Sequence, residues 1–182
     1  ARLITVDVFD TLVVRSFLHP SGSRGLLEAR VLRLTGRASY ATLREEAESA
    51  ARTMLGRDPT LSELLDHAVS RRQLGREEAG TLRQLELDME RRLLQPRRGV
   101  LDALAALGSP PLTALSDMYL PADDLKAVLP ERVRSLTQSW QVSCETGRRK
   151  DQDSTWPALA QLQGVAVDEW LHIGDNEHSD VQ

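Results

Sequence analysis

The amino-acid sequence is poor in cysteine and lysine and has no long apolar run, and each shortage excludes a class of protein. Cys144 is the single cysteine among 182 residues. An internal disulfide is therefore impossible, which excludes a disulfide-stapled secreted scaffold and favours a reducing, cytoplasmic compartment. No apolar run approaches the roughly 20 residues that a membrane-spanning helix needs. The formal net charge of −4 gives no overall basic footprint for nucleic acid. We therefore expect neither a membrane nor a nucleic-acid partner.

Lysine is scarce among the 23 basic residues, because only Lys126 and Lys150 are lysines and the others are arginines. The plainest interpretation is an arginine-favouring genomic composition. The remaining composition, 41% apolar and 27% charged, is that of a globular protein, and the length suits one core with a modest insertion. Residues 2–6 lead straight into Asp7 without a leader, so we expect the chain to be part of something longer.

Four short apolar runs, each ending at a polar residue or a glycine, predict buried strands. They are Leu3–Asp7, Leu112–Ser116, Trp140–Ser143 and Trp170–Ile173. About a hundred residues between the first and second runs have helical patterns instead. Thr60 and Glu63 form a capping box that opens one helix, and a stripe of apolar residues predicts a longer helix over Glu77–Leu94, which Pro96 stops. The members of this stripe are Leu82, Leu85, Met89 and Leu93.

The order of these elements predicts an α/β fold. A strand, a helical block and then alternating helices and strands indicate a Rossmann-like parallel sheet with helices on both faces and an all-helical insertion after the first strand. Ligands of such sheets bind beyond the carboxyl ends of the strands. The residues that follow each strand are therefore the place to look for chemistry.

Those residues form an ordered set, although each has a structural alternative. Asp7 suits a nucleophile or a metal ligand, or a turn. Ser116 suits a hydrogen-bond donor to an anion, or a helix cap. Lys150 suits a point charge toward phosphate, or a solvated charge. Asp175 and Asp180 beside a glycine turn suit a hard divalent cation, or an acidic loop that caps a helix. His172 and His178 would suit a transition metal, but with no further His or Cys nearby the sequence favours oxygen ligands.

Three stretches of the sequence resemble a known family. Asp-Val-Phe-Asp-Thr-Leu (7–12), Ser-Asp-Met-Tyr-Leu-Pro (116–121) and His-Ile-Gly-Asp-Asn-Glu-His-Ser-Asp (172–180), together with Lys150, resemble the four motifs of the haloacid dehalogenase-like (HAD) superfamily. They are most similar to a bacterial subgroup of predicted hydrolases, some of which are attached to glycosyltransferase domains. The resemblance implies a catalytic core of residues 1–15 and 97–182 and a helical cap of residues 16–96.

The resemblance also implies a mechanism. Asp7 would attack the phosphoryl group of a small phosphorylated metabolite and form an aspartyl-phosphate. Ser116 and Lys150 would hold the phosphoryl oxygens, and Thr11 would support the loop. Mg²⁺ would be the cofactor, and Asp117 and Arg15 would contact the substrate. The implied metal ligands are Asp7, the Phe9 carbonyl, Asp175 and Asp180.

One position departs from the pattern of superfamily phosphatases. These enzymes place a second aspartate, the general acid/base, two residues after the nucleophile, where this chain has Phe9. If the strand continues, Asp10 points away from Asp7 and does not replace it. Losing a general acid typically costs about 10²–10⁴-fold in rate, so we expect slow turnover or a substrate with a good leaving group.

Three other functions compete with the phosphatase. One is a non-catalytic or regulatory HAD-like module of a larger, glycosyltransferase-type protein. A second is a dehalogenase, whose family members carry an aromatic residue after the nucleophile and need no metal. A third, phosphonate cleavage, needs a cap lysine, and residues 16–96 contain none. One of only two lysines falls where the superfamily needs a cation, which favours a site role for Lys150.

Overall fold

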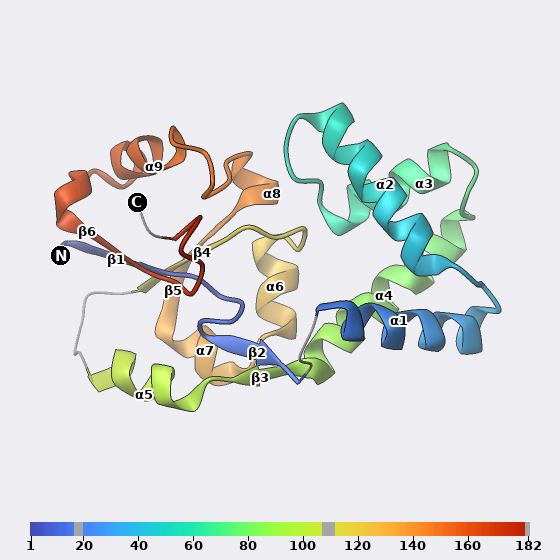
Figure 1. Ribbon diagram of the computed structural model, residues 1–182, viewed down its shortest axis with the longest axis horizontal. Helices are drawn as coiled ribbons and strands as arrows, with labels where there is room; N and C mark the ends of the chain where they lie inside the picture. Colours follow the sequence, from blue (N-terminus) through green and yellow to red (C-terminus); the bar gives the residue numbers. More distant parts are fainter. Residues whose placement is uncertain (17–19, 107–111, 181–182) are drawn as a thin grey trace.

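A parallel sheet forms the centre of the fold in the computed structural model, which describes residues 1–16, 20–106 and 112–180 (Figure 1). The sheet of the described residues has the strand order β5-β4-β1-β6. Its strands are β1 (Leu3–Val6), β4 (Leu112–Ser116), β5 (Thr137–Val142) and β6 (Trp170–Ile173). Neighbouring strands pair in parallel, with Ile4 opposite both Leu112 and Leu171. The α/β class expected from the sequence is confirmed.

Helices cover the sheet on two sides. In the view of Figure 1, α9 (Thr155–Gln163) lies above the sheet, and α5 (Arg98–Ala106) and α7 (Glu131–Leu136) lie below it. Three shorter elements complete this part: α6 (Ala122–Val128), α8 (Ser143–Thr146) and the 3-10 turn η1 (Val167–Glu169). Every residue of β1 and β4 is buried, which is typical of central strands that are covered on both faces.

Three of the four strand predictions are accurate to within one residue, and the fourth, for β5, is less accurate. β4 and β6 have the predicted bounds, and β1 ends one residue earlier than expected. β5 begins at Thr137, three residues before the predicted start. β5 is an edge strand in the described sheet, and its first residues, Thr137–Ser139, are polar. A polar stretch gives no apolar signal, although its backbone pairs with β4.

A helical segment, residues 20–93, interrupts the chain between two short strands. It contains α1 (Pro20–Thr35), α2 (Tyr40–Leu55), α3 (Leu61–Ser70) and α4 (Arg76–Leu93), which lie to the right of the sheet in Figure 1. At its base, β2 (Val13–Arg15) pairs antiparallel with β3 (Leu94–Pro96). The sequence did not predict these three-residue strands. Pro96 therefore ends β3, whereas the helix itself already ends at Leu93.

Local signals within the helical segment are confirmed. Thr60 Oγ1 accepts the Glu63 amide at 3.1 Å, and the Glu63 carboxylate accepts the Thr60 amide at 2.8 Å, so the capping box forms. Leu82, Leu85 and Met89 of the predicted stripe are buried. None of the described helices is long and apolar enough to cross a membrane.

Hydrogen bonds connect the helical segment to the part of the chain that contains the parallel sheet, here called the sheet-bearing part. The Leu61 amide donates to the Tyr119 carbonyl at 2.8 Å, and Arg83 Nη2 contacts Asp124 of α6 at 2.7 Å. Arg57 Nη1 donates to the Cys144 carbonyl at 2.9 Å. Cys144 thereby lies in the junction between the two parts.

Burial in this junction should make the Cys144 thiol unreactive. Burial, with a smaller contribution from Glu145, raises the pKa of Cys144 to about 12, and only the thiolate attacks thiol reagents. At pH 8 we expect the native protein to react with a chromogenic disulfide roughly a hundredfold or more slowly than the chain unfolded in guanidinium. The unfolded chain should then release one equivalent. Rapid stoichiometric reaction of the native protein would contradict this packing.

Candidate active site

The strand order brings three of the predicted site residues to one edge of the sheet. β1 lies between β4 and β6, so Asp7, which follows β1, has Ser116 of β4 on one side and Asp175 of the β6 loop on the other. The Asp7 amide donates to the Ile173 carbonyl at 2.8 Å, which continues the pairing of β1 with β6 up to this edge. These residues line a cavity of about 360 Å³ together with Lys150 and Asp180. These predicted site residues thus lie together at the carboxyl ends of the strands, where ligands of such sheets bind.

The Lys150 ammonium lies between two carboxylates of this edge. Its Nζ donates to Asp7 Oδ1 at 2.7 Å and also to Asp180 Oδ1, and Lys150 is only 4% exposed. Burial lowers the pKa of Lys150, but the two carboxylates outweigh it, so the pKa lies above its usual value and the side chain stays charged. Burial raises the pKa of Asp7 to about 6 despite the attraction of Lys150, and the neighbouring Asp180 and Asp175 contribute to the rise.

Asp180 is held by partners on both carboxylate oxygens. Oδ1 contacts Lys150 and His172 Nε2, the latter at 3.1 Å, and Oδ2 accepts the Asn176 amide at 3.0 Å. Burial acts to raise the pKa of Asp180, but these contacts, with Lys150 foremost, hold it below its usual value. Gly174 makes the approach possible, because a Cβ at this position would collide with the Asp180 carboxyl group.

His172 is part of a hydrogen-bond chain that ends on Asp180. Trp170 Nε1 donates to Thr5 Oγ1 at 2.7 Å, and Thr5 Oγ1 lies 2.7 Å from His172 Nδ1. Asp180 Oδ1 can only accept, so His172 carries a proton on Nε2, and in the neutral ring Nδ1 accepts the Thr5 hydroxyl proton. Burial lowers the pKa of His172, so the ring is neutral. Both ring nitrogens are thus engaged, which agrees with oxygen ligands rather than histidine at this edge.

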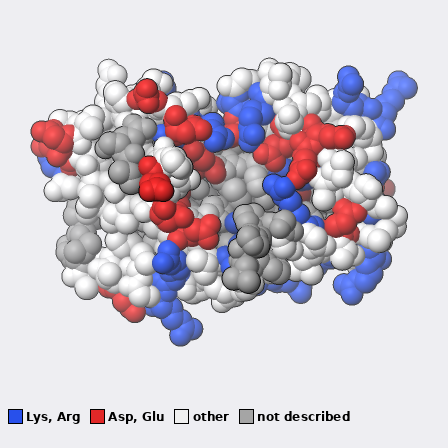
Figure 2. All heavy atoms as spheres, in the orientation of Figure 1, with Lys and Arg blue, Asp and Glu red and all other residues white. Residues whose placement is uncertain are grey.

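The donor set fits a hard divalent cation. Carboxylate oxygens of Asp7, Asp175 and Asp180 lie within 4.8 Å of one another, and Thr11 Oγ1 donates to Asp175 Oδ1 at 3.2 Å. Three carboxylates against one ammonium leave two negative charges without compensation, and all three offer oxygen ligands. Figure 2 shows acidic side chains gathered in a band near the middle of the visible face. Phe9, the fourth predicted ligand, lines the same cavity.

Two of the residues expected to contact substrate are already engaged by the protein. Asp117 accepts the Lys150 backbone amide at 3.0 Å, so its carboxylate holds the segment that carries Lys150. Arg15 makes a bidentate pair with Glu90 of α4, at 3.1 Å for both contacts. The buried Glu90 carboxylate neutralises the Arg15 guanidinium, and the contact of Arg15 with a substrate stays a prediction. Ser116, by contrast, is buried beside the cavity, and its hydroxyl has no hydrogen-bond partner among the described residues.

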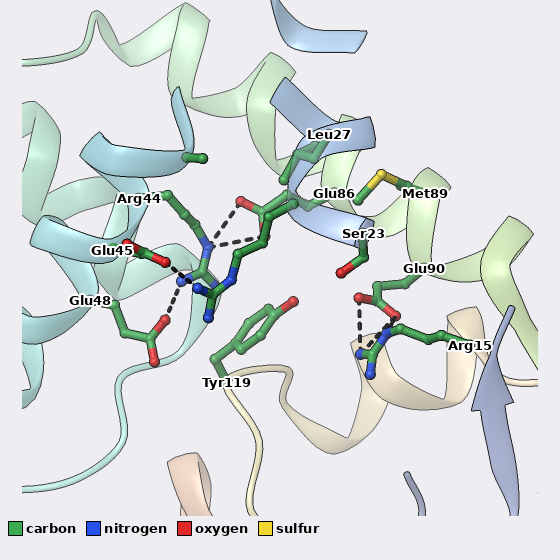
Figure 3. Close-up of a pocket in the computed structure, with 12 residues that line it drawn as sticks. Arg15, Ser23, Leu27, Arg44, Glu45, Glu48, Glu86, Met89, Glu90 and Tyr119 are labelled. Atoms are coloured by element: carbon green, nitrogen blue, oxygen red, sulfur yellow. Dashed lines mark hydrogen bonds and ion pairs between the residues drawn. The ribbon is translucent and has the colours of Figure 1, made fainter. Parts of the chain in front are cut away.

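Arg15 faces a second cavity, of about 190 Å³, between the helical segment and the loop after β4 (Figure 3). The cavity is lined by ion pairs, among them Arg44 with Glu86 at 3.2 Å, and the Tyr119 hydroxyl points into it. The Arg15 guanidinium also lies 4.5 Å from the centre of the Phe9 ring. Phe9 lines the first cavity and Arg15 the second, so this contact joins a residue of one cavity to a residue of the other.

The turn after β1 differs from the extended strand on which the argument about Asp10 depended. The strand ends at Val6, and Asp10 has a left-handed φ of 58°. The amides of Leu12 and Val13 return to the Val8 carbonyl at 2.9 and 3.0 Å, which closes a tight turn. Asp10 is therefore exposed at the rim of the Asp7 cavity instead of being directed to the opposite face. The condition under which Asp10 would point away from Asp7 is not met.

The Lys150 arrangement predicts an unequal effect of removing the chain's two lysines. Lys150→Met leaves two buried carboxylates facing each other, so we expect unfolding in denaturant with chelator present to lose about 3–5 kcal/mol. Lys126→Met is the matched control, because Lys126 pairs with Asp123 at the surface, and it should change stability by less than about 1 kcal/mol. Equal losses in the two variants would contradict a buried, structurally essential Lys150.

Comparison with protein-family models and with curated proteins finds no match to the sequence. The fold does match solved structures. The 2-haloacid dehalogenase from Pseudomonas syringae pv. tomato has a TM-score of 0.67 at 18% identity, over 99% of this chain and 80% of that one. The L-2-haloacid dehalogenase from Xanthobacter autotrophicus gives 0.57 at 16%, over 98% and 71%. The HAD-hydrolase YfnB from Bacillus subtilis bound to magnesium gives 0.55 at 14%, over 99% and 82%. This chain therefore has the fold of the haloacid dehalogenase-like hydrolases.

Proposed function

We propose that the chain is a Mg²⁺-dependent phosphohydrolase of the HAD superfamily that forms an aspartyl-phosphate on Asp7. The observation that carries the proposal is the set of groups around this carboxylate. Asp7 adjoins the Lys150 ammonium, the Ser116 hydroxyl and the carboxylates of Asp175 and Asp180, all at one cavity. Such a set supplies a nucleophile, donors to phosphoryl oxygens and oxygen ligands to a divalent cation.

The proposed reaction proceeds in two displacements on phosphorus. An Asp7 carboxylate oxygen attacks the phosphorus, and the bond to the leaving oxygen breaks with its electron pair. Water then attacks the same phosphorus, which releases inorganic phosphate and restores Asp7. Ser116 and Lys150 donate to the phosphoryl oxygens during both steps. Mg²⁺, held by Asp7, Asp175 and Asp180, would supply Lewis-acid stabilisation of the phosphoryl charge.

Phe9 limits which substrates suit this site. A phenyl ring cannot donate a proton, so the leaving oxygen must depart without an acid at this position. We infer that good leaving groups, such as those of acyl or aryl phosphates, are turned over and that alkyl phosphates are slow. Asp10, which belongs to the same turn as Phe9, has a carboxylic side chain at the cavity rim.

Dehalogenation is the second candidate, and two observations favour it. Two of the solved structures with this fold are described as haloacid dehalogenases, and an aromatic residue follows Asp7 at position 9. In that reaction Asp7 displaces halide from carbon and water hydrolyses the resulting ester, with no metal required. Asp175 and the uncompensated charge of the cluster favour the phosphohydrolase instead.

Nucleophilic attack by Asp7 is tested with an aryl phosphate in the presence of Mg²⁺. Asp7→Asn should abolish hydrolysis, since the amide does not displace an aryloxide. Asp10→Asn, a neighbouring carboxylate, should change the rate less than about tenfold, because an aryl leaving group needs little help from an acid. Turnover by Asp7→Asn at the rate of the unchanged protein would rule out the mechanism. Chloride release from a 2-haloacid in chelator, without phosphatase activity, would favour the dehalogenase.

Metal binding is tested separately by thermal unfolding. Mg²⁺ at about ten times its dissociation constant should stabilise the protein by roughly 1.4 kcal/mol, and Asp175→Asn should lose this gain. Glu177→Gln is the matched control, because Glu177 is an exposed acid of the same loop outside the cluster, and it should keep the gain. Stabilisation that survives Asp175→Asn would place the metal elsewhere.

A further inference from the structure

Asp58 is a buried carboxylate that joins the helical segment to the sheet-bearing part. It lies between α2 and α3, is only 4% exposed, and belongs to a loop that reaches toward α8 in Figure 1. Ser143 Oγ donates to Asp58 Oδ2 at 2.5 Å, and Arg149 Nη1 donates to both carboxylate oxygens at 3.0 and 3.3 Å. Arg52 of α2 supplies one more donor, its Nε, at 3.0 Å from Oδ1.

The partners of Asp58 belong to the network that holds both proposed phosphate-binding side chains. Ser143 Oγ accepts the Met118 amide at 3.0 Å, two residues after Ser116. Arg149 immediately precedes Lys150, whose own amide is held by Asp117 beside Ser116. One carboxylate of the helical segment is therefore bonded, directly or through one hydrogen bond, to the loops 116–118 and 143–150.

The free energy of burying Asp58 depends on the positions of both loops. A buried carboxylate that loses its donors keeps its full desolvation cost, so the docked position of Asp58 is favourable only with Ser143 and Arg149 in place. Arg149, in turn, has a second partner in Asp151, at 3.1 Å. Without Asp58, the Arg149 guanidinium can turn outward with the exposed Asp151. Arg149, the residue before Lys150, then loses its hydrogen bonds to the buried Asp58 carboxylate.

We propose that Asp58 is a positioning residue through which docking of the helical segment orders the anion-binding loops. Docking and assembly of the site around Ser116 and Lys150 are then a single event, so the chemistry proceeds only when the helical segment is in contact. The consequence for turnover rests on the function proposed above, whereas the ordering of the two loops does not depend on that function.

The test compares Asp58→Asn with Arg52→Gln. Asp58→Asn removes the charge without changing the shape, and Arg52→Gln removes a partner of Asp58 whose side-chain hydrogen bonds go to Asp58 and Glu48, not to residues 116–118 or 143–150. Amide hydrogen exchange of segments 116–118 and 143–150 should accelerate roughly ten- to hundredfold in Asp58→Asn, the range for losing charge-assisted hydrogen bonds. With an aryl phosphate, kcat should fall by a similar factor while KM changes less. Arg52→Gln should alter exchange and kcat by less than about threefold.

A double-mutant cycle with Arg149→Gln separates coupling from independent damage. Asp58→Asn and Arg149→Gln remove the same contact, so their effects on exchange should not add. Additive effects, or unchanged exchange in both loops of Asp58→Asn, would overturn the inference. If Asp58→Asn does not fold, Ser143→Ala should loosen loop 116–118, and unchanged exchange there would also overturn it. An inactive native protein would refute the proposed function alone, because the exchange data still decide the role of Asp58.

Discussion

The buried contact of the Lys150 ammonium with Asp7 and Asp180 is the constraint on which the site depends. It ties the loop after α8 to the end of β1 and to the loop after β6, three segments that are far apart in the sequence. Buried charges are tolerated only when their partners are in place, so the surrounding residues act to keep them there. His172 and the backbone of Asn176 hold Asp180, and Gly174 leaves it room.

The charges of the ammonium and the carboxylates at this edge also determine which ligands the site suits. One ammonium cannot compensate three carboxylates, so the cluster suits a further cation, and Lys150 is directed at Asp7, the proposed nucleophile. In the proposed reaction, Phe9 limits the substrates to those whose leaving groups need no proton. Arg15, which lies over the Phe9 ring, and Glu90 neutralise each other at the second cavity (Figure 3), so this pair presents no net positive charge to an anionic substrate.

The sequence predicted what depends on local pattern and missed what depends on distant pairing. The central strands and the residues that follow them were found because buried strands and capping boxes are local signals. Glu90 and Arg149, which pair with Arg15 and Asp58, lie 75 and 91 residues away from them, and no periodicity reveals these pairs. The bond from the Lys150 backbone amide to Asp117 exists only in the folded chain, so the sequence did not reveal it. Asp10 was judged from strand geometry that ends at Val6.

The most direct test of the account is the identity of the group that becomes covalently attached to Asp7. The protein is incubated with an aryl phosphate and Mg²⁺, quenched in acid and digested, and the peptide that contains Asp7 is examined by mass spectrometry. Phosphoryl transfer through Asp7 predicts a phosphoryl adduct on Asp7, which is absent from Asp7→Asn. A carboxyalkyl ester formed on Asp7 from a 2-haloacid, with no phosphoryl adduct, would contradict phosphoryl transfer, and an unmodified Asp7 with both substrates would contradict its role as nucleophile.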